Sequence, residues 1–294
     1  MDQLLLVVAA LLFSTGGAAI KACSLPSWQV ACFRSGVAAI TLLLVFPRAI
    51  RHWAPRTALT GLAYATTLVL FVVANKLTTS ANAIFLQSTA PLYLLFLAPL
   101  FLGEPIRRFD VLRTCMIGCG AFLLLLGSET VVATAPNPRH GNIIAACSGA
   151  TWALTIAGLR SLARHTEGKD SSLAAVILGN ILAAAGSAPA AFPVAHVSAH
   201  DLVIVLYLGV FQVALAYIAL TRSVKVVPAF QASVLLLVEP VFNPIWSWVF
   251  HGERPTGLAL TGGFLILSVS LFSGWRRSRG REFDSRLTEE EAGT

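Results

Sequence analysis

Ten stretches of the sequence are long, apolar and poor in charge, and they limit what this chain can fold into. Each is about 17 to 22 residues long, the length of helix that crosses the hydrocarbon core of a bilayer at about 1.5 Å per residue. We therefore predict ten transmembrane helices, at residues 4–20, 28–46, 58–74, 81–101, 110–127, 142–162, 172–191, 202–220, 229–250 and 257–274.

Composition supports this interpretation. Of the 294 residues, 56% are hydrophobic and 12% are charged, whereas soluble domains carry about 25% charged residues. So few polar residues do not cover a water-exposed globule of this size. The strands of a membrane β-barrel would alternate polar and apolar residues, but runs such as Ala121–Leu126 (AFLLLL) do not. The sequence predicts an all-α integral membrane protein.

The basic residues favour one orientation in the membrane. With the N-terminus inside, sixteen Lys and Arg residues lie in inner loops or in the C-terminal tail, and only Lys21, Lys76, Arg139 and Arg254 lie in outer loops. By the positive-inside rule we expect a multi-pass protein of the bacterial inner membrane with both termini cytoplasmic. Topology thus accounts for the net charge of +7, and we expect no nucleic-acid partner.

One segment of the chain occurs twice. At an offset of 149 residues, KLTTSANAIFLQSTAPLYLLFLAPLFLGE aligns with KVVPAFQASVLLLVEPVFNPIWSWVFHGE, and Pro91 matches Pro240 while Gly103 and Glu104 match Gly252 and Glu253. We interpret this match as the duplication of a five-helix unit. The expected organisation is a first unit at 3–128, a second at 141–275 and a cytoplasmic tail at 276–294.

The odd number of helices in each unit has a functional consequence. The second unit enters the membrane upside down relative to the first, and such inverted repeats are typical of secondary transporters that work by alternating access. We assign the matched glutamates, Glu104 and Glu253, to architecture and gating.

The repeated segments also resemble a known family. ANAIFLQSTAPLYLLFLAPLFLGEPI and ASVLLLVEPVFNPIWSWVFHGERP resemble the fourth and ninth helices of the drug/metabolite transporter superfamily with two EamA-type domains. ALLFST and SGATWAL resemble the opening helix of each domain, so the resemblance covers about residues 3 to 275. It implies a ten-helix exporter of small metabolites, and the sequence is similar to the bacterial aromatic amino acid exporters.

We therefore expect export of small amphipathic metabolites, with aromatic or other hydrophobic amino acids as the first candidates. The alternatives are a channel or facilitator for small solutes and an exporter of another class, such as nucleobases or cationic drugs. The sequence has no catalytic or nucleotide-binding motif, so we expect neither an enzyme nor an ATP-driven pump. No metal or cofactor is expected. The expected partners are the substrate, lipid and, as a candidate coupling ion, the proton, and the chain is a monomer or a homodimer.

Glu239 is the most unusual residue within a span, because a charged carboxylate at the centre of a bilayer costs about 2.5 to 3.5 kcal/mol on insertion scales. Asn243 and Trp246 follow it at helical spacing, so this face is expected to look into the bundle. Three interpretations are open: Glu239 binds a substrate amine, carries a coupling proton, or satisfies a backbone carbonyl freed by proline. Pro91, Pro240 and Pro244 are candidate hinges, with fixed helix curvature as the alternative.

Other polar and aromatic side chains within the spans complete the predicted substrate-binding set. Because residues five apart do not share an α-helical face, Gln212 and Tyr217 are not both expected at the cavity. For any single polar side chain, a hydrogen bond that packs two helices is the alternative. Arg34 either reaches the outer headgroups, bonds a helix carbonyl or binds a substrate carboxylate. Besides Glu239, Asn243 and Trp246, the set comprises Phe13, Ser14, Tyr64, Thr67, Asn82, Tyr93, Trp152 and Gln212.

Overall fold

A computed structural model describes residues 2–90, 92–93, 108–126, 133–165, 171–223, 236 and 238–269. These residues form helices joined by short linkers, without strands. The helices are α1 (Asp2–Ser14), α2 (Gly16–Ala22), α3 (Ser27–Val45), the 3₁₀ helix η1 (Pro47–His52), α4 (Pro55–Leu77), α5 (Ser80–Gln87), α7 (Arg108–Leu126), α8 (Pro138–His165), α9 (Ser171–Ala191), α10 (Ala199–Tyr207), the π-helix η2 (Leu208–Leu215), α11 (Ala216–Ser223), α13 (Val238–His251) and the helix Gly257–Val269.

Six described helical segments are long and apolar enough to cross a membrane, which makes the chain a multi-pass membrane protein. They correspond to six of the ten predicted spans. Each of the other four spans includes residues outside the described parts, so ten helices and an inverted repeat remain predictions. The six segments are Leu4–Ala22, Ser27–Val45, Pro55–Leu77, Pro138–Leu159, Ser171–Ala191 and Ala199–Ser223.

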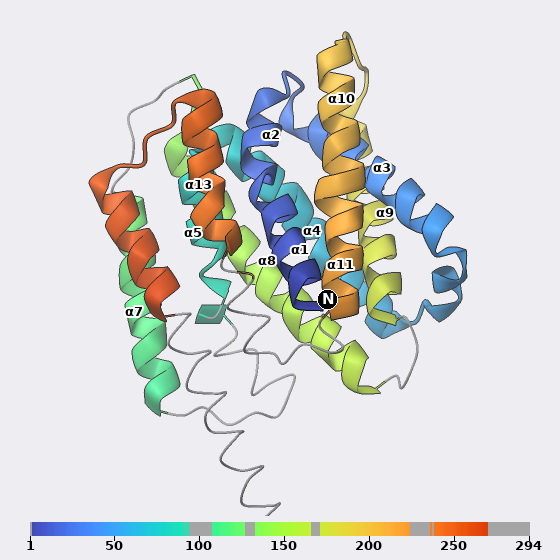
Figure 1. Ribbon diagram of the computed structural model, residues 1–294, viewed down its shortest axis with the longest axis horizontal. Helices are drawn as coiled ribbons and strands as arrows, with labels where there is room; N and C mark the ends of the chain where they lie inside the picture. Colours follow the sequence, from blue (N-terminus) through green and yellow to red (C-terminus); the bar gives the residue numbers. More distant parts are fainter. Residues whose placement is uncertain are drawn as a thin grey trace, which may run out of the picture.

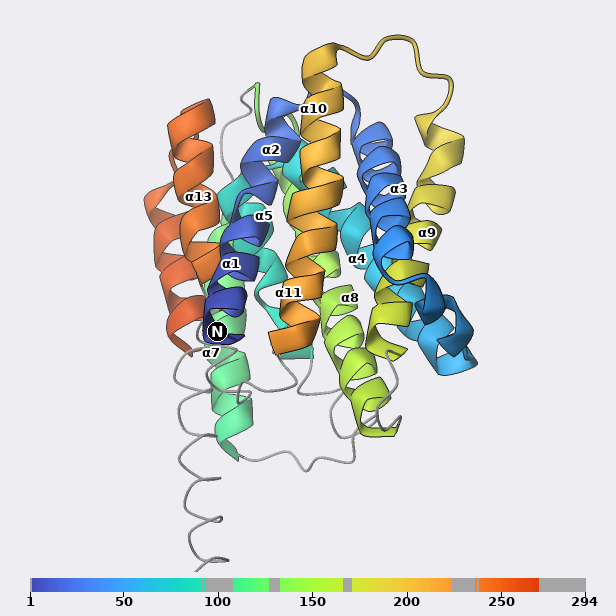
Figure 2. The same cartoon turned by 45° about the vertical axis from the view of Figure 1, so that its right-hand side comes forward.

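The helices form a bundle in which α4 packs against both α8 and α9 (Figures 1 and 2). Glycines permit the close approach. A Cβ atom added at Gly179 would lie 2.7 Å from the carbonyl oxygen of Gly61, and one at Gly158 would lie 2.5 Å from the hydroxyl of Thr60. Small residues at helix contacts are typical of membrane bundles, where backbones approach closely enough for van der Waals packing.

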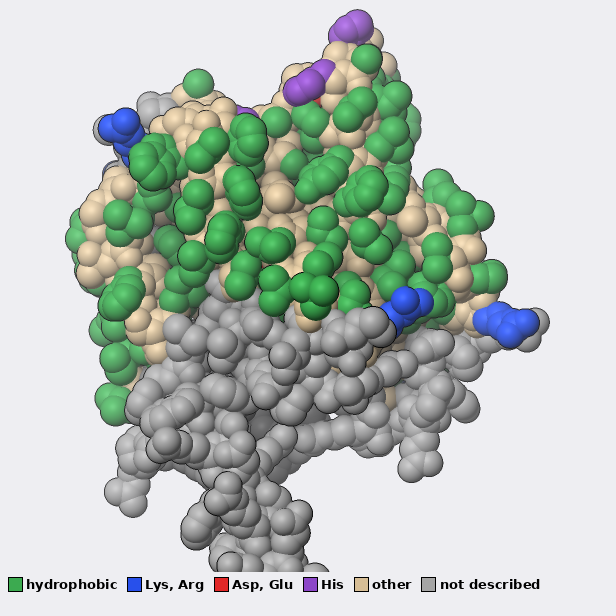
Figure 3. Space-filling model, in the orientation of Figure 1, with side chains coloured by type: hydrophobic (Ala, Val, Ile, Leu, Met, Phe, Trp, Pro, Cys, Tyr) green, Lys and Arg blue, Asp and Glu red, His purple; other side chains and the backbone are tan. Residues whose placement is uncertain are grey.

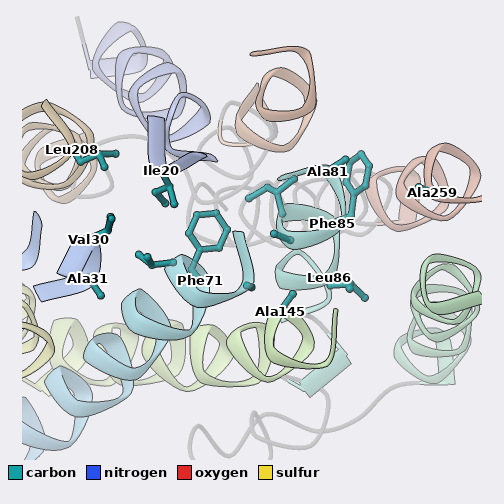
Figure 4. Close-up of a cluster of buried hydrophobic side chains, with 14 of the residues drawn as sticks. Ile20, Val30, Ala31, Phe71, Ala81, Phe85, Leu86, Ala145, Leu208 and Ala259 are labelled. Atoms are coloured by element: carbon teal, nitrogen blue, oxygen red, sulfur yellow. The ribbon is translucent and has the colours of Figure 1, made fainter. Parts of the chain in front are cut away.

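Large apolar side chains cover the outside of the bundle, as Figure 3 shows for one face. Leu44, Phe250 and Phe264 are each at least 70% exposed, which suits helices that face hydrocarbon. Inside, a buried cluster joins α2, α3, α4, α5 and α8, with Ile20 and Phe71 near its centre (Figure 4). Apolar residues therefore face lipid on the outside of the bundle and pack against one another in its interior.

The two predicted spans 4–20 and 81–101 are not continuous helices. The first divides into α1 and α2 at Thr15, whose hydroxyl is 2.8 Å from that of Tyr207 on α10. In the second, α5 ends at Gln87 and a turn follows, in which the amide of Thr89 donates to the carbonyl of Leu86 at 3.2 Å. Pro91, the predicted hinge in this span, lies outside the described residues.

Three helices end together at one end of the bundle. Helices α2, α4 and α13 finish at one end, which we call the closed end, and the chain begins near the other (Figure 2). The linkers after α2, α4 and α13 therefore meet at the closed end.

Candidate substrate cavity

A small cavity lies among helices α1, α3, α4, α5, α8, η2, α11 and α13. Its volume is about 70 Å³, enough for a few water molecules and far below the roughly 300 to 1,000 Å³ of a ligand pocket. The described residues that line the cavity are Phe13, Arg34, Thr67, Leu68, Phe71, Gln87, Trp152, Gln212, Val213, Tyr217 and Glu239.

Arg34 brings a positive charge into this cavity. It is 1% exposed, and its Nη2 donates to the carbonyl oxygen of Leu68 on α4 at 2.9 Å. Its Nε has no hydrogen-bond partner among the described residues. Of the interpretations offered for Arg34, the bond to a helix carbonyl is confirmed and the reach to the headgroups is wrong, because the side chain turns into the bundle.

Glu239 brings a carboxyl group to the same cavity. It lies on α13 and lines the same cavity as Arg34. Although both side chains are described, they form no ion pair with each other. The cavity therefore holds one guanidinium and one carboxyl group that are not bonded directly to each other.

Aromatic rings form much of the remaining wall. Tyr217 meets Phe13 edge to face, with ring centroids 5.0 Å apart, and meets Tyr64 in the same way at 5.0 Å. Phe71 and Trp152 complete the aromatic lining. Tyr64 itself is not in contact with the cavity; it lies behind Tyr217, and its hydroxyl accepts a hydrogen bond from Asn180 at 3.4 Å.

Gln212 and Tyr217 both line the cavity, so the expectation that at most one of them would do so is wrong. The physical reason is the π-helix η2, which contains Gln212 and ends two residues before Tyr217. Hydrogen bonds from residue i to i+5 widen the helical turn, and residues five apart then share a face. Such segments are frequently found at functional sites.

Five of the eleven residues predicted to bind substrate line the cavity: Phe13, Thr67, Trp152, Gln212 and Glu239. The structure does not place the other six among the lining residues. Asn82 donates to Asn142 on α8 at 3.3 Å, and the hydroxyl of Tyr93 donates to the carbonyl of Ala146 at 3.0 Å. These two side chains make the helix-packing bonds that were the alternative.

Ser14, Asn243 and Trp246 lie between α1, α2 and α13. The indole Nε1 of Trp246 donates to the hydroxyl of Ser14 at 3.0 Å, and that hydroxyl donates to the carbonyl of Leu11. Asn243 is fully buried beside Gly17. Of Tyr64, Trp152 and Trp246 in the predicted set, Trp152 lines the cavity, whereas Tyr64 and Trp246 do not. The candidate hinges Pro240 and Pro244 are buried within α13, which continues as a helix through both.

The sequence prediction missed six lining residues. Tyr217 was excluded because regular α-helical geometry was assumed for this span, whereas the structure has a π-helix there. Arg34 was weighed as a ligand for a substrate carboxylate but was not included in the predicted set. Phe71 follows Tyr64 and Thr67 at helical spacing, a signal that was present in the sequence. Gln87 is a polar residue within a predicted span, and its amide donates to the hydroxyl of Ser148 at 2.8 Å. Leu68 and Val213 are apolar and carry no such signal.

The closed end is held by a buried ion pair. Lys21 Nζ lies 2.8 Å from Glu253 Oε1, and the side chains are 2% and 4% exposed. Lys21 also donates to the carbonyl oxygens of Thr78 and Thr134, while Glu253 accepts the backbone amide of Ser80 at 3.0 Å. These bonds join segments from both halves of the chain.

A second polar contact lies at the same end. The amide and hydroxyl of Ser24 donate to the two carboxylate oxygens of Asp201, at 2.6 and 2.7 Å. Lys76 donates to the carbonyl oxygen of Cys23. The linker between α2 and α3 is thereby tied to α4 and α10, so the closed end is sealed by polar bonds.

A multi-pass helical bundle with a small cavity, lined by a guanidinium and a carboxyl group, and with polar bonds closing one end has the architecture of a membrane transporter. The EamA-like transporter family matches residues 2–126 and 139–275, and the chain belongs to this family, within the drug/metabolite transporter superfamily.

The chain is similar to the Pseudopaline exporter CntI of Pseudomonas aeruginosa, in each of two strains. The identity is 25% over 272 residues, covering 90% of this chain and 92% of the relative. It also resembles a chain of known crystal structure that is 19% identical, with a TM-score of 0.64 and coverage of 95% of this chain and 98% of the other. The second likeness concerns the fold alone.

Proposed function

We propose that this protein exports small amphipathic metabolites with both a carboxylate and an amine, first among them aromatic and other hydrophobic amino acids, across the bacterial inner membrane. The observation that carries the proposal is the presence of Arg34 and Glu239 in one aromatic-walled cavity. Membership of a transporter family and the likeness to an exporter support the direction of transport.

The cavity offers a complementary partner for each part of such a molecule. A guanidinium binds a carboxylate through two parallel hydrogen bonds, and the Leu68 carbonyl holds Arg34 by one nitrogen only. The Glu239 carboxylate suits an ammonium group. Phe13, Phe71 and Trp152 supply apolar surface for the side chain, as in ligand sites where a few polar groups fix the orientation.

Alternating access is the proposed mechanism, through ten helices in two inverted units. The family matches the chain twice, over segments that resemble the proposed units in extent, and this supports a duplication. We propose that both termini are cytoplasmic, which places the closed end outside. Export then requires the Lys21–Glu253 seal to open after the substrate has entered from the cytoplasm.

A channel or facilitator is the second candidate function. A continuous pore would need an open route through the closed end, but the buried Lys21–Glu253 ion pair links the helices there. The cavity, at about 70 Å³, is also much smaller than a solute-conducting pore would require. These features favour a carrier that is closed at this end over a continuous pore.

Counterflow in proteoliposomes tests the proposal. Vesicles loaded with unlabelled L-phenylalanine are expected to accumulate radiolabelled L-phenylalanine transiently, and the panel includes L-tryptophan, L-leucine, a nucleobase and a quaternary ammonium cation. Arg34→Gln and Glu239→Gln are expected to reduce counterflow at least tenfold. Arg222→Gln is the matched control, because Arg222 lies against Phe46 outside the cavity.

Counterflow of the nucleobase or the cation alone would contradict the proposed substrate class. Flux without counterflow would favour the channel.

A further inference from the structure

Helix α13 carries a polar stripe that runs from the cavity to the closed end. Glu239, Asn243, Ser247 and His251 follow one another at four-residue intervals, so they lie on one face. Asn243 and Ser247 are buried, at 0% and 1% exposure, whereas Trp248 and Val249 on the opposite side are more than half exposed. The stripe therefore faces the interior of the bundle.

The middle of the stripe meets α2 and α5. A Cβ atom added at Gly17 would lie 2.6 Å from Asn243 Oδ1 and 2.8 Å from the hydroxyl of Ser80. The glycine thus lets two polar side chains from different helices converge at one point of the interface.

The polar atoms at this point have no hydrogen-bond partner among the described residues. They are Nδ2 and Oδ1 of Asn243 and the hydroxyl oxygens of Ser80 and Ser247. Each buried polar group without a partner costs about 1 to 3 kcal/mol, and buried groups of this kind are commonly bonded to internal water. Four such atoms lie along the buried face of α13, which packs against α2 and α5, and they offer hydrogen-bonding sites for internal water.

Groups that exchange protons lie at both ends of this buried face. At the cavity end is Glu239, faced by Arg34 of α3 and Tyr217 of α11. At the closed end lie Lys21 of α2, His251 and Glu253, with Lys76 of α4 and Asp201 of α10 in the second polar contact there, and His251 Nε2 lies 2.8 Å from the carbonyl oxygen of Ala18. Twelve residues of helix separate Glu239 from His251, a rise of about 18 Å at about 1.5 Å per residue.

We propose that the buried face of α13, through Asn243, Ser80 and Ser247, conducts protons between the closed end and Glu239, so that an inward proton flux drives export. The inference rests on the proposed function and adds its energy source. A proton from the outer solution passes along hydrogen-bonded water to the Glu239 carboxylate. When the cavity opens to the cytoplasm, that proton leaves and the substrate ammonium group binds the freed carboxylate.

Two substitutions test this route. Asn243→Leu and Ser247→Ala remove its polar atoms with little change in volume, and neither leaves a new buried group without a partner. The matched controls are Asn75→Leu on α4 and Ser223→Ala on α11, because both side chains are fully buried and neither helix is among those that pack closely against α13. Proteoliposomes hold the dye pyranine and L-phenylalanine as the probe, and acidification of the lumen during phenylalanine efflux is recorded beside counterflow at equal pH.

Wild type and both controls are expected to acidify the lumen. Asn243→Leu and Ser247→Ala are expected to reduce acidification at least tenfold while counterflow, which needs no net proton movement, stays within twofold of wild type. The proposal is overturned by wild-type counterflow without acidification, by normal acidification in both variants, or by loss of counterflow in both. Absence of counterflow in wild type for every probe would contradict the proposed function instead.

Discussion

Lys21 and Glu253 form a buried ion pair at 2.8 Å that joins the end of α2 to the linker after α13. The two residues lie in the two separate segments that match the transporter family. Glu253 also accepts a hydrogen bond from the amide of Ser80, and Lys21 also donates to two backbone carbonyls. The pair therefore links several segments at the closed end.

Neutralising one partner of this pair is expected to destabilise the closed end. Lys21→Met or Glu253→Gln leaves the other charge buried, at a cost of about 3 to 5 kcal/mol. The double variant removes both charges and is expected to recover much of that loss. Thermal unfolding in detergent, followed by tryptophan fluorescence, measures the effect. Arg254→Gln, an exposed neighbour, is the control and should unfold at the wild-type temperature; equal stability of all variants would contradict the seal.

Cys23 reports on the same region by its reactivity. Burial, with a smaller contribution from the nearby Asp201 carboxylate, raises the pKa of the Cys23 thiol to about 11. Since the thiolate is the reactive form, labelling by N-ethylmaleimide at pH 7 to 8 is expected to be slow and to rise steadily as the pH approaches 11.

The measurement uses a variant in which Cys23 is the remaining cysteine, after replacement of Cys32, Cys115, Cys119 and Cys147 by serine or alanine. Adding Glu253→Gln should increase the labelling rate at pH 8 at least fivefold, because it opens the closed end. Labelling of Cys23 as fast as that of free cysteine would show that the closed end is open in solution.

Two glycines of α9 are expected to respond differently to the same substitution. A Cβ at Gly179 would lie 2.4 Å from the ring of Tyr64 and 2.7 Å from the backbone oxygen of Gly61, whereas one at Gly186 meets nothing within 4 Å. Gly179→Ala should therefore force α9 away from α4 and cost about 1 to 3 kcal/mol, while Gly186→Ala should be neutral or slightly stabilising through helix propensity. Melting temperatures of the two purified variants compare these outcomes directly.

The class of fold was predictable because the membrane imposes it. Apolar runs of sufficient length identify helices whatever their neighbours, and the six spans that fall in described parts of the chain appear where the sequence places them. Helix breaks were less predictable: the division at Thr15 and the turn after Gln87 depend on contacts with other helices, such as the bond between Thr15 and Tyr207.

The cavity was predictable only in part, for a physical reason that particular residues illustrate. Sequence periodicity shows which residues share a face of a helix, but not which other helix that face contacts. Asn82 and Trp152 are therefore equally good candidates in the sequence, although Asn82 bonds Asn142 of α8 and Trp152 lines the cavity. Periodicity also assumes α-helical geometry, which η2 departs from, and Tyr217 was excluded for that reason. Arg34 was ambiguous because one charge in a span has several stable partners, and its hydrogen bond to the Leu68 carbonyl depends on how α3 packs against α4.

Trp152 is expected to set the preference for large apolar side chains. It lines the cavity from α8 and contributes apolar surface that an aromatic substrate would cover, whereas Arg34 and Glu239 contribute the polar groups. Trp152→Ala should reduce transport of L-phenylalanine at least tenfold while transport of L-alanine, which does not reach this surface, changes by less than threefold, because burial of apolar area scales with substrate size. Competition by each amino acid in the counterflow assay measures the ratio. Trp248→Ala is the control, since Trp248 is exposed on the outer face of α13, and an equal loss for both substrates would assign Trp152 to packing instead.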